Sequence, residues 1–185
     1  KEFFRSSDFN SRFINSAVGP DGCLYVTDMY RGIIQDAAWF NEGNREFARR
    51  TGVNKHIQMG RIWRIRHQDH RPYQDKPQML SESTEKLVRH LQNPIGWWRD
   101  TAQKLILLRN DREKAIPLLE GLFRFTQSPL PRIHALWTLN GMQAITPEIK
   151  KEALIDRSPI LRRTMVQIIE PGLPQEVDLL LPLEN

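Results

Sequence analysis

The sequence contains a single cysteine, Cys23, and this scarcity excludes several kinds of chemistry. One thiol cannot form an internal disulfide, a C-x-x-C redox pair or a C-x-x-C-H haem attachment within the chain. Cys23 stands at an alternating position of a predicted strand, where a small buried side chain is the expected role. No run of about 20 apolar residues is present, so no membrane-spanning helix is predicted.

Signatures of common enzyme classes are missing as well. The sequence has no G-x-S-x-G, Walker, G-x-G-x-x-G or H-E-x-x-H motif, which argues against a self-contained hydrolase, NTPase or nucleotide-dependent oxidoreductase. The net charge of +5 is uneven, because only Glu46 and Asp69 are acidic in the basic segment 45–71. Such a segment can attract nucleic acid or another anion, but no nucleic-acid-binding motif accompanies it. We therefore expect no nucleic-acid partner.

The first third of the chain has the pattern of β-strands. The stretch 18–34 is predicted to form a β-hairpin around Pro20-Asp21-Gly22, which is favourable turn chemistry. The predicted strands are Cys23–Asp28 and Gly60–Arg66, the second with Ile62 and Arg64 on one face and with Arg61, Trp63 and Ile65 on the other. Between them, residues 36–59 are predicted to be an irregular insertion with a short helix near 44–50, ended by Gly52.

The second half has a helical period. Segment 67–80 contains Pro72 and Pro77 and is the predicted linker between residues 1–66 and 81–185. Ser83 is expected to cap the first helix. Further helices are predicted around 98–109 and over 112–125, 131–142, 147–155 and 159–169, with an amphipathic segment at 175–181.

A spaced motif recurs in this helical half. A proline is followed by an arginine and then by a small or apolar residue in three places, with arginines at Arg99, Arg132 and Arg162. The spacing is roughly 30 residues, shorter than the ~40–47 of typical HEAT repeats. Stacked helix pairs bury their apolar faces only against neighbouring pairs. The predicted fold class is therefore mainly α, a HEAT-like α–α solenoid preceded by a small antiparallel β piece.

The stretches "GPDGCLYVTDMYRGII", "GRIWRI", "NPIGWWRDTAQKLILLR" and "PRIHALWTLNGM" occur in that order. Their order resembles a large bacterial family of haem-binding, membrane-bound-dehydrogenase-type proteins. In that family a β-propeller similar to soluble PQQ-dependent glucose/sorbosone dehydrogenases precedes HEAT-like repeats, and many members end in a c-type cytochrome domain. The resemblance covers roughly residues 15–170.

The resemblance implies that this chain is the junction between the last propeller strands and the first repeats. The start, "KEFFRSSD", has no initiator Met and fits a processed chain or a piece of a longer one. PQQ and haem would then belong to the parent protein, and none of the family's catalytic residues can be matched here. The implied partners are the rest of the propeller, a cytochrome domain and a protein bound by the repeats, in the periplasm or outside the cell. An independent HEAT-like interaction module without a redox role is the alternative.

Asp28, Tyr30 and Arg31 form the candidate ligand-facing group, because they follow a strand end where propellers bind ligands. Arg31 would pair with an anionic quinone or substrate, and Asp28 and Tyr30 would position a sugar hydroxyl. The alternative is that Asp28 caps a turn, Tyr30 packs and Arg31 forms an ion pair. His67 and His70 are metal-ligand types, but nearby Pro72 favours a solvated linker over a metal site.

The repeat arginines Arg99, Arg132 and Arg162 have two interpretations. As a ladder on one face of the solenoid they would bind a partner or hold the propeller. Otherwise they make local ion pairs and helix contacts, which contribute little individually. The helical half also contains four aromatic residues that we expect in the core: Trp97, Trp98, Phe123 and Trp137.

Overall fold

The computed structural model describes residues 3–172, and the chain divides into two compact units, Lys1–Asp75 and Lys76–Asn185. The boundary falls inside the predicted linker 67–80. The described part is mainly α-helical with one three-stranded antiparallel sheet, as the fold-class prediction states in its coarser form. The amphipathic segment predicted at 175–181 lies outside the described residues.

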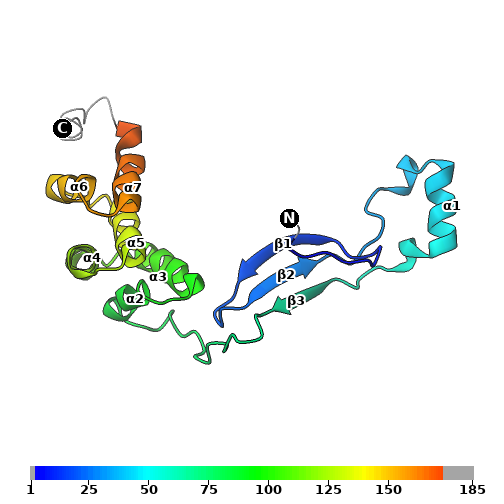
Figure 1. Cartoon of the computed structure of the whole chain (residues 1–185), viewed down its shortest axis with the longest axis horizontal. Helices are drawn as coiled ribbons and strands as arrows, with labels where there is room; N and C mark the ends of the chain where they lie inside the picture. Colours follow the sequence, from blue (N-terminus) through cyan, green and yellow to red (C-terminus); the bar gives the residue numbers. More distant parts are fainter. Residues whose placement is uncertain (1–2, 173–185) are drawn as a thin grey trace. The chain divides into compact units, whose positions relative to one another are not determined.

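The N-terminal unit is built around the sheet, whose strand order is β1-β2-β3 (Figure 1). The strands are β1 (Phe13–Val18), β2 (Leu24–Asp28) and β3 (Arg61–Ile65), and both pairings are antiparallel. The predicted hairpin 18–34 is therefore displaced, because its first strand, β1, ends at residue 18 and its second strand is β2. Residues 29–34 form no strand, because the chain turns away at Tyr30, where φ is 49°.

The predicted turn chemistry at residues 20–22 is confirmed. Asp21 Oδ1 accepts the Cys23 backbone N–H at 3.0 Å, and Gly22 has φ 78°, which favours glycine. Asp21 Oδ2 also lies 2.6 Å from Arg64 Nη2, which joins the turn to β3. Cys23 is buried, as expected, although β2 begins one residue after it.

The insertion between β2 and β3 holds two short 3₁₀ turns, Ala37–Trp39 and Val53–Lys55, and helix α1 (Glu42–Thr51). The helix begins before the predicted residue 44 because the Asn41 side chain accepts the Asn44 backbone N–H at 2.8 Å. It ends as predicted at Gly52, whose φ of 66° suits a left-handed C-terminal cap.

The sheet has little apolar cover in this unit. Buried hydrophobic side chains among the described residues of the N-terminal unit are Cys23, Val26, Ala48 and Val53. Within the same residues, the outer edges of β1 and β3 pair with no further strand. Large apolar side chains are exposed on these edge strands: Ile14, Val18, Ile62 and Trp63. A small sheet with so little burial is marginally stable by itself.

Up to residue 172, where the described part of the chain ends, the C-terminal unit consists of six α-helices followed by a 3₁₀ turn, Glu170–Gly172. The helices are α2 (Thr84–His90), α3 (Gly96–Arg109), α4 (Arg112–Phe125), α5 (Pro129–Gly141), α6 (Pro147–Leu154) and α7 (Pro159–Ile169). The predicted bounds of α4 and α7 are confirmed, and Ser83 caps α2 as expected. Helix α5 begins earlier than predicted, because Pro129 suits the first helical turn.

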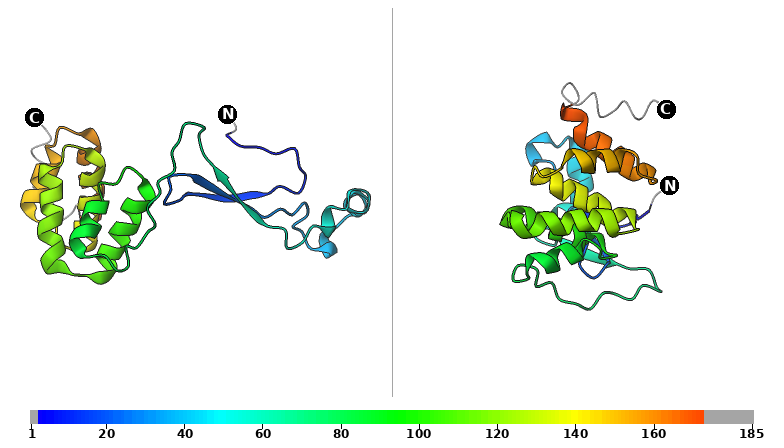
Figure 2. Two further views of the ribbon diagram at one scale, coloured as in Figure 1. Left: turned by 90° about the horizontal axis from the view of Figure 1, so that it is seen from below. Right: turned by 90° about the vertical axis from the view of Figure 1, so that its left-hand side faces the viewer.

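These helices pack as three consecutive pairs, α2–α3, α4–α5 and α6–α7. The second helices of the pairs contact one another in turn, α3 with α5 and α5 with α7, and α2 contacts α4. Figure 1 shows the two rows, and Figure 2 shows the helices following in chain order from green to orange. One continuous hydrophobic core runs from Met79 to Ile169, so each pair completes the core of its neighbour.

The predicted aromatic core is confirmed in part. Trp98 and Phe123 are buried, and Trp97 packs against the core while partly exposed. Trp137 is also partly exposed. Among residues 3–172, no helix is both long enough and apolar enough to span a bilayer.

Candidate functional site

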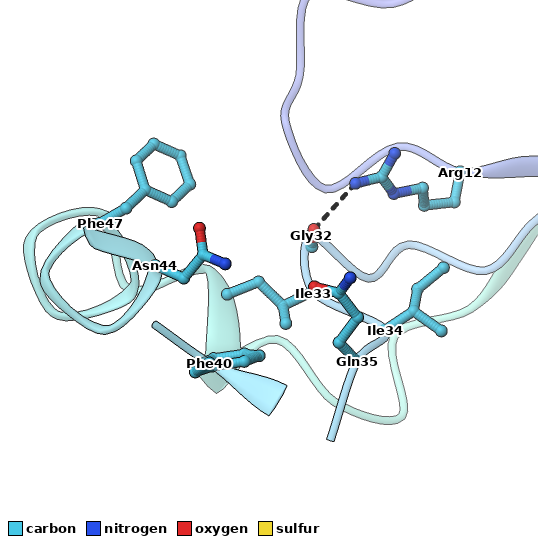
Figure 3. A pocket seen from close by; sticks show the side chains of 8 residues that line it. All are labelled: Arg12, Gly32, Ile33, Ile34, Gln35, Phe40, Asn44 and Phe47. Atoms are coloured by element: carbon cyan, nitrogen blue, oxygen red, sulfur yellow. Dashed lines mark hydrogen bonds between the residues drawn. The ribbon is translucent and has the colours of Figure 1, made fainter. Parts of the chain in front are cut away.

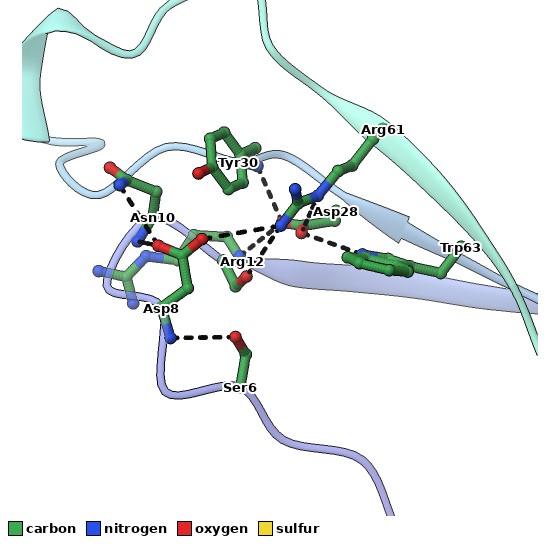
Figure 4. Close-up of polar contacts among 9 residues, drawn as sticks. Ser6, Asp8, Asn10, Arg12, Asp28, Tyr30, Arg61 and Trp63 are labelled. Carbon is green, nitrogen blue, oxygen red and sulfur yellow. Dashed lines mark hydrogen bonds and ion pairs between the residues drawn. The ribbon is translucent and has the colours of Figure 1, made fainter.

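Asp28 is the centre of a polar cluster at the end of β2 (Figure 4). Its side chain is fully buried. Oδ1 accepts the backbone N–H groups of Arg12 at 2.7 Å and Tyr30 at 2.9 Å. Oδ2 accepts Arg61 Nε–H at 3.1 Å and Trp63 Nε1–H at 3.2 Å. Burial alone would raise the pKa of Asp28, but these donors lower it to about 2, so the carboxylate is ionised and holds the three strands together.

Tyr30 is held in an unusual backbone conformation beside Asp28. Its φ of 49° is left-handed, which costs free energy for a residue with a side chain. The Asp28 bond to the Tyr30 N–H compensates, and the Arg61 guanidinium lies 4.0 Å from the centre of the Tyr30 ring. A hydrogen bond to Asp8 raises the pKa of the Tyr30 hydroxyl. The predicted turn cap at Asp28 and packing of Tyr30 are therefore observed.

Arg31 does not form the ion pair that was its alternative interpretation. Its side chain is exposed, and Nε donates to the backbone carbonyl of Ile33 at 3.1 Å. No carboxylate in the described part of the chain pairs with it. The Asp28 carboxylate accepts the Tyr30 backbone N–H, whereas the Arg31 guanidinium donates to the Ile33 carbonyl in the following turn. Ligand contact by these three residues stays a prediction.

Sequence reasoning missed the residues that surround Asp28. Arg61 and Trp63 were placed on one face of a strand, which is correct, but nothing local predicted that Asp28 faces Arg61 in the pairing of β2 with β3. Arg12 and Asp8 precede the segment that we interpreted. A search for cations at alternating positions of both strands would have found Arg61.

The loop after Arg31 borders an open cavity of about 420 Å³ (Figure 3). Its walls come from the residue before β1, the loop 32–35 and the start of α1. Eight residues line it: Arg12, Gly32, Ile33, Ile34, Gln35, Phe40, Asn44 and Phe47. The loop can pass close to Val53 because Gly32 has no side chain. A Cβ at residue 32 would lie 2.8 Å from Val53 Cβ.

The cavity is lined by one cationic side chain, two side-chain amides and several apolar side chains. Its lining contains no carboxylate, histidine or cysteine, so no ordinary general acid, general base or nucleophile faces it. The Arg12 guanidinium donates to the backbone carbonyls of Gly32 at 2.9 Å and Arg31 at 3.3 Å. Its charge therefore supports the loop.

His67 and His70 do not converge. His67 Nδ1 accepts the Asp69 backbone N–H at 3.2 Å, whereas His70 Nε2 lies 3.1 Å from the Asp21 carbonyl. The backbone N–H of Tyr73 donates to the same carbonyl at 3.1 Å, so part of the predicted linker is bonded to the hairpin turn. Within residues 3–172, no group of three or more metal-ligand side chains is close enough to hold an ion.

Arg99, Arg132 and Arg162 occupy equivalent places, each the fourth residue of the second helix in its pair. Arg99 Nη1 donates to the carbonyl of Asn93 at 2.6 Å, after α2. Arg132 Nε donates to Phe123 O at 2.7 Å, in the last turn of α4.

Arg162 repeats this contact in the third pair, where its Nη1 donates to Asp156 O at 2.7 Å, after α6. In every pair the arginine thus satisfies carbonyls where the first helix ends. These are the local contacts of the second interpretation, and partner binding by the three arginines stays a prediction.

A family model described as "Domain of unknown function (DUF7133)" matches residues 1–69. The matched part contains all three strands and α1, and it leaves α2–α7 outside. No curated protein and no solved structure matches the chain.

Proposed function

We propose that this chain is a non-catalytic structural and interaction segment of a larger, secreted or periplasmic dehydrogenase-like protein. Its N-terminal unit supplies the last strands of a β-propeller, and its C-terminal unit is a row of HEAT-like repeats. The observation that supports this most strongly is the sheet. Among residues 3–172 its two outer edges pair with no further strand, its edge strands expose apolar side chains, and little of it is covered within its own unit. Further strands would pair those edges and bury those side chains.

The helical unit supports the second part of the proposal. Its helices form three successive pairs with one shared core, and an arginine recurs at the same place in each. Such packing is typical of a solenoid, in which every helix pair needs its neighbours to bury its apolar face. Such rows commonly present an extended surface to a partner.

The chemistry of the described residues supports a role without catalysis. The buried carboxylate Asp28 is fully occupied by donors from its own unit, and the cavity beside Arg12 lacks acid–base groups. PQQ and c-type haem would therefore act in other parts of the parent protein.

The self-contained core of the helical unit also favours the alternative, an independent HEAT-like interaction module. The two functions differ in what they require of the sheet. A propeller segment needs further strands, whereas an independent module needs a sheet that is stable as it is.

Hydrogen–deuterium exchange of the whole chain, followed by mass spectrometry, separates these functions. We expect amides of β1–β3 to exchange at least ~100-fold faster than those of α3 and α5, because local stability follows apolar burial. Equal protection of the sheet and the helices would contradict the propeller role. Further P-D-G-x-L-Y-V segments in coding sequence upstream of residue 1 would support it, and a reading frame that begins at residue 1 would contradict it.

A direct assay tests the absence of catalysis. Titration with PQQ should give no binding heat, and dye-linked oxidation of glucose or sorbosone should stay at the buffer rate. Quinone-dependent turnover by this chain would refute the non-catalytic role.

A further inference from the structure

An open groove of about 640 Å³ lies between two neighbouring helix pairs of the C-terminal unit. One wall is formed by the end of α4 and its turn into α5, and the other by the end of α6 and its turn into α7. The groove is distinct from the Asp28 cluster and from the cavity beside Arg12, both of which belong to the N-terminal unit.

The walls of the groove are held together by one largely buried ion pair. Arg132 Nη2 lies 2.5 Å from Asp156 Oδ2, with only 15% and 13% of the two side chains exposed. Asp156 Oδ1 accepts the backbone N–H of Ser158 at 2.8 Å. These bonds hold the pKa of Asp156 below its usual value although burial opposes ionisation. The groove is therefore formed before any partner arrives, which lowers the entropic cost of binding.

One exposed apolar side chain lines this preformed groove. Ile155 is 69% exposed there. A single exposed apolar residue is ordinary on a protein surface, but Ile155 stands at a concave surface that an exposed arginine, Arg157, also lines.

One arginine of the groove has no carboxylate partner. Both acidic residues that line the groove already have an arginine partner: Glu152 pairs with Arg124 at 3.1 Å, and Asp156 pairs with Arg132. Arg124 also pairs with Glu120, which does not line the groove, at 3.2 Å. Arg157 lines the groove and is exposed, and its guanidinium makes no hydrogen bond or ion pair with any residue in the described part of the chain. The Arg157 guanidinium is therefore available to a carboxylate of a partner.

We propose that this groove docks an extended acidic peptide of a partner protein. A carboxylate of the peptide pairs with the Arg157 guanidinium, and a neighbouring apolar side chain packs on Ile155. A single exposed ion pair contributes little by itself, so the apolar contact is needed and a small anion does not suffice. The inference deepens the proposed role of the helical unit in interaction and rests on it.

Fluorescence anisotropy on the whole chain tests the proposal. The probe is a fluorescein-labelled peptide of about nine residues that alternates glutamate and leucine, and its control has glutamine in place of glutamate. We expect binding of the acidic probe, with a dissociation constant about tenfold higher for Arg157→Glu or for the glutamine peptide. Arg163→Glu makes the same charge change at an exposed position of α7 that does not line the groove, and it should change affinity less than about twofold.

Two further variants test the apolar contact and the charge separately. Ile155→Ser should weaken binding about fivefold through lost apolar contact. Circular dichroism should confirm that each variant keeps its helices, and Arg157→Gln repeats the test without a charge reversal.

Several outcomes would overturn the proposal: no binding of the acidic probe, equal binding of the glutamine peptide, or equal loss in Arg157→Glu and Arg163→Glu. A dimer in size-exclusion chromatography that Arg157→Glu abolishes would identify a second copy as the occupant and would also overturn it. The variants at Ile155, Arg157 and Arg163 all change the helical unit, so binding of the probe to the basic segment 45–71 would leave their affinities equal. Failure of this inference is therefore distinguishable from failure of the proposed function in the exchange and turnover assays.

Discussion

At the scale of single residues, the buried charged groups of this chain stabilise its fold. Asp28 receives four hydrogen bonds, two from backbone N–H groups and two from side chains. At the opposite end of β2, Asp21 accepts hydrogen bonds from the Cys23 backbone N–H, the Tyr25 hydroxyl and the Arg64 guanidinium. A buried charge is tolerated only with such partners, so both carboxylates are needed for structure within this unit and neither is available as a catalytic group there.

Asp28→Asn should destabilise the N-terminal unit by about 2–4 kcal/mol, because the amide nitrogen would face the donors of Arg61 and Trp63. Hydrogen exchange should accelerate in β1–β3 while the helices stay unchanged. Asp75→Asn, at an exposed position, is the control and should have no effect.

The same residue predicts a pH dependence. Folding lowers the pKa of Asp28 from 3.8 to about 2, so its contribution is present above pH 3.8 and is lost as pH falls towards 2. Loss of protection in the sheet over that pH window, reduced in Asp28→Asn, would support the assignment. An identical acid profile in wild type and variant would contradict it.

His134 predicts a second pH effect, in the helical unit. Its Nδ1–H donates to Gln103 Oε1 at 2.8 Å and its Nε2 accepts from Arg99 Nε at 3.2 Å, which requires the neutral ring. Burial and the nearby Arg99 charge lower the pKa of His134 below 6.5. Folding therefore favours the neutral form, and stability is fully present above pH 6.5 and falls below it.

Thermal unfolding at pH 7.5 and pH 5 measures this effect. The wild-type helical unit should lose more stability between these values than His134→Gln, which keeps an acceptor for Arg99. His67→Gln, at an exposed site, should behave like wild type. A wild-type midpoint that does not fall on acidification would exclude the mechanism.

At the scale of elements, arginine contacts define how each helix pair closes. Arg132, in α5, bonds to two other segments. It donates to Phe123 O at the end of α4, where its guanidinium also lies over the Phe123 ring, and it pairs with Asp156 after α6. The repeat is therefore held by hydrogen bonds as well as by apolar contact.

Arg132→Lys should destabilise the helical unit by about 2–3 kcal/mol, although it keeps the charge, because lysine cannot reach both partners with a planar fork. Urea denaturation followed by circular dichroism measures this loss. Arg163→Lys is the matched control and should stay within about 0.5 kcal/mol of wild type. Equal midpoints for the two variants would show that the Arg132 contacts do not stabilise the unit.

At the scale of the whole molecule, the two units differ sharply in apolar burial. The helical unit has a continuous core from Met79 to Ile169, whereas the sheet unit buries few apolar side chains and exposes several aromatic ones. Stability depends mainly on such burial, so the two units should unfold separately.

Calorimetry should therefore show two transitions, with the sheet unit melting first. Leu139→Ala, in the buried core of α5, should lower only the second transition, by about 2–5 kcal/mol. Asp28→Asn should lower only the first. A single transition that both substitutions shift equally would contradict independent units.

Local patterns were enough to predict the helices and the turn. The bounds of α4 and α7, the Ser83 cap and the Asp21-Gly22 turn depend on residues within about four positions of one another. The start positions of α1 and α5 were predicted less accurately. Asn41 caps α1 and Pro129 begins α5, but both residue types are also common in turns, so the sequence alone did not assign them to helices.

The sequence by itself determined the division into a β part and a helical part, because strand and helix periods appear in neighbouring residues. Only the tertiary structure decided the Asp28 cluster, which joins residues 33 and 35 positions apart across an insertion that hides the register of β3. It also decided the groove at Arg157, since that surface exists only where two helix pairs stack. Contacts between distant segments follow from strand register and helix packing, and neither can be predicted from the periodicity of neighbouring residues.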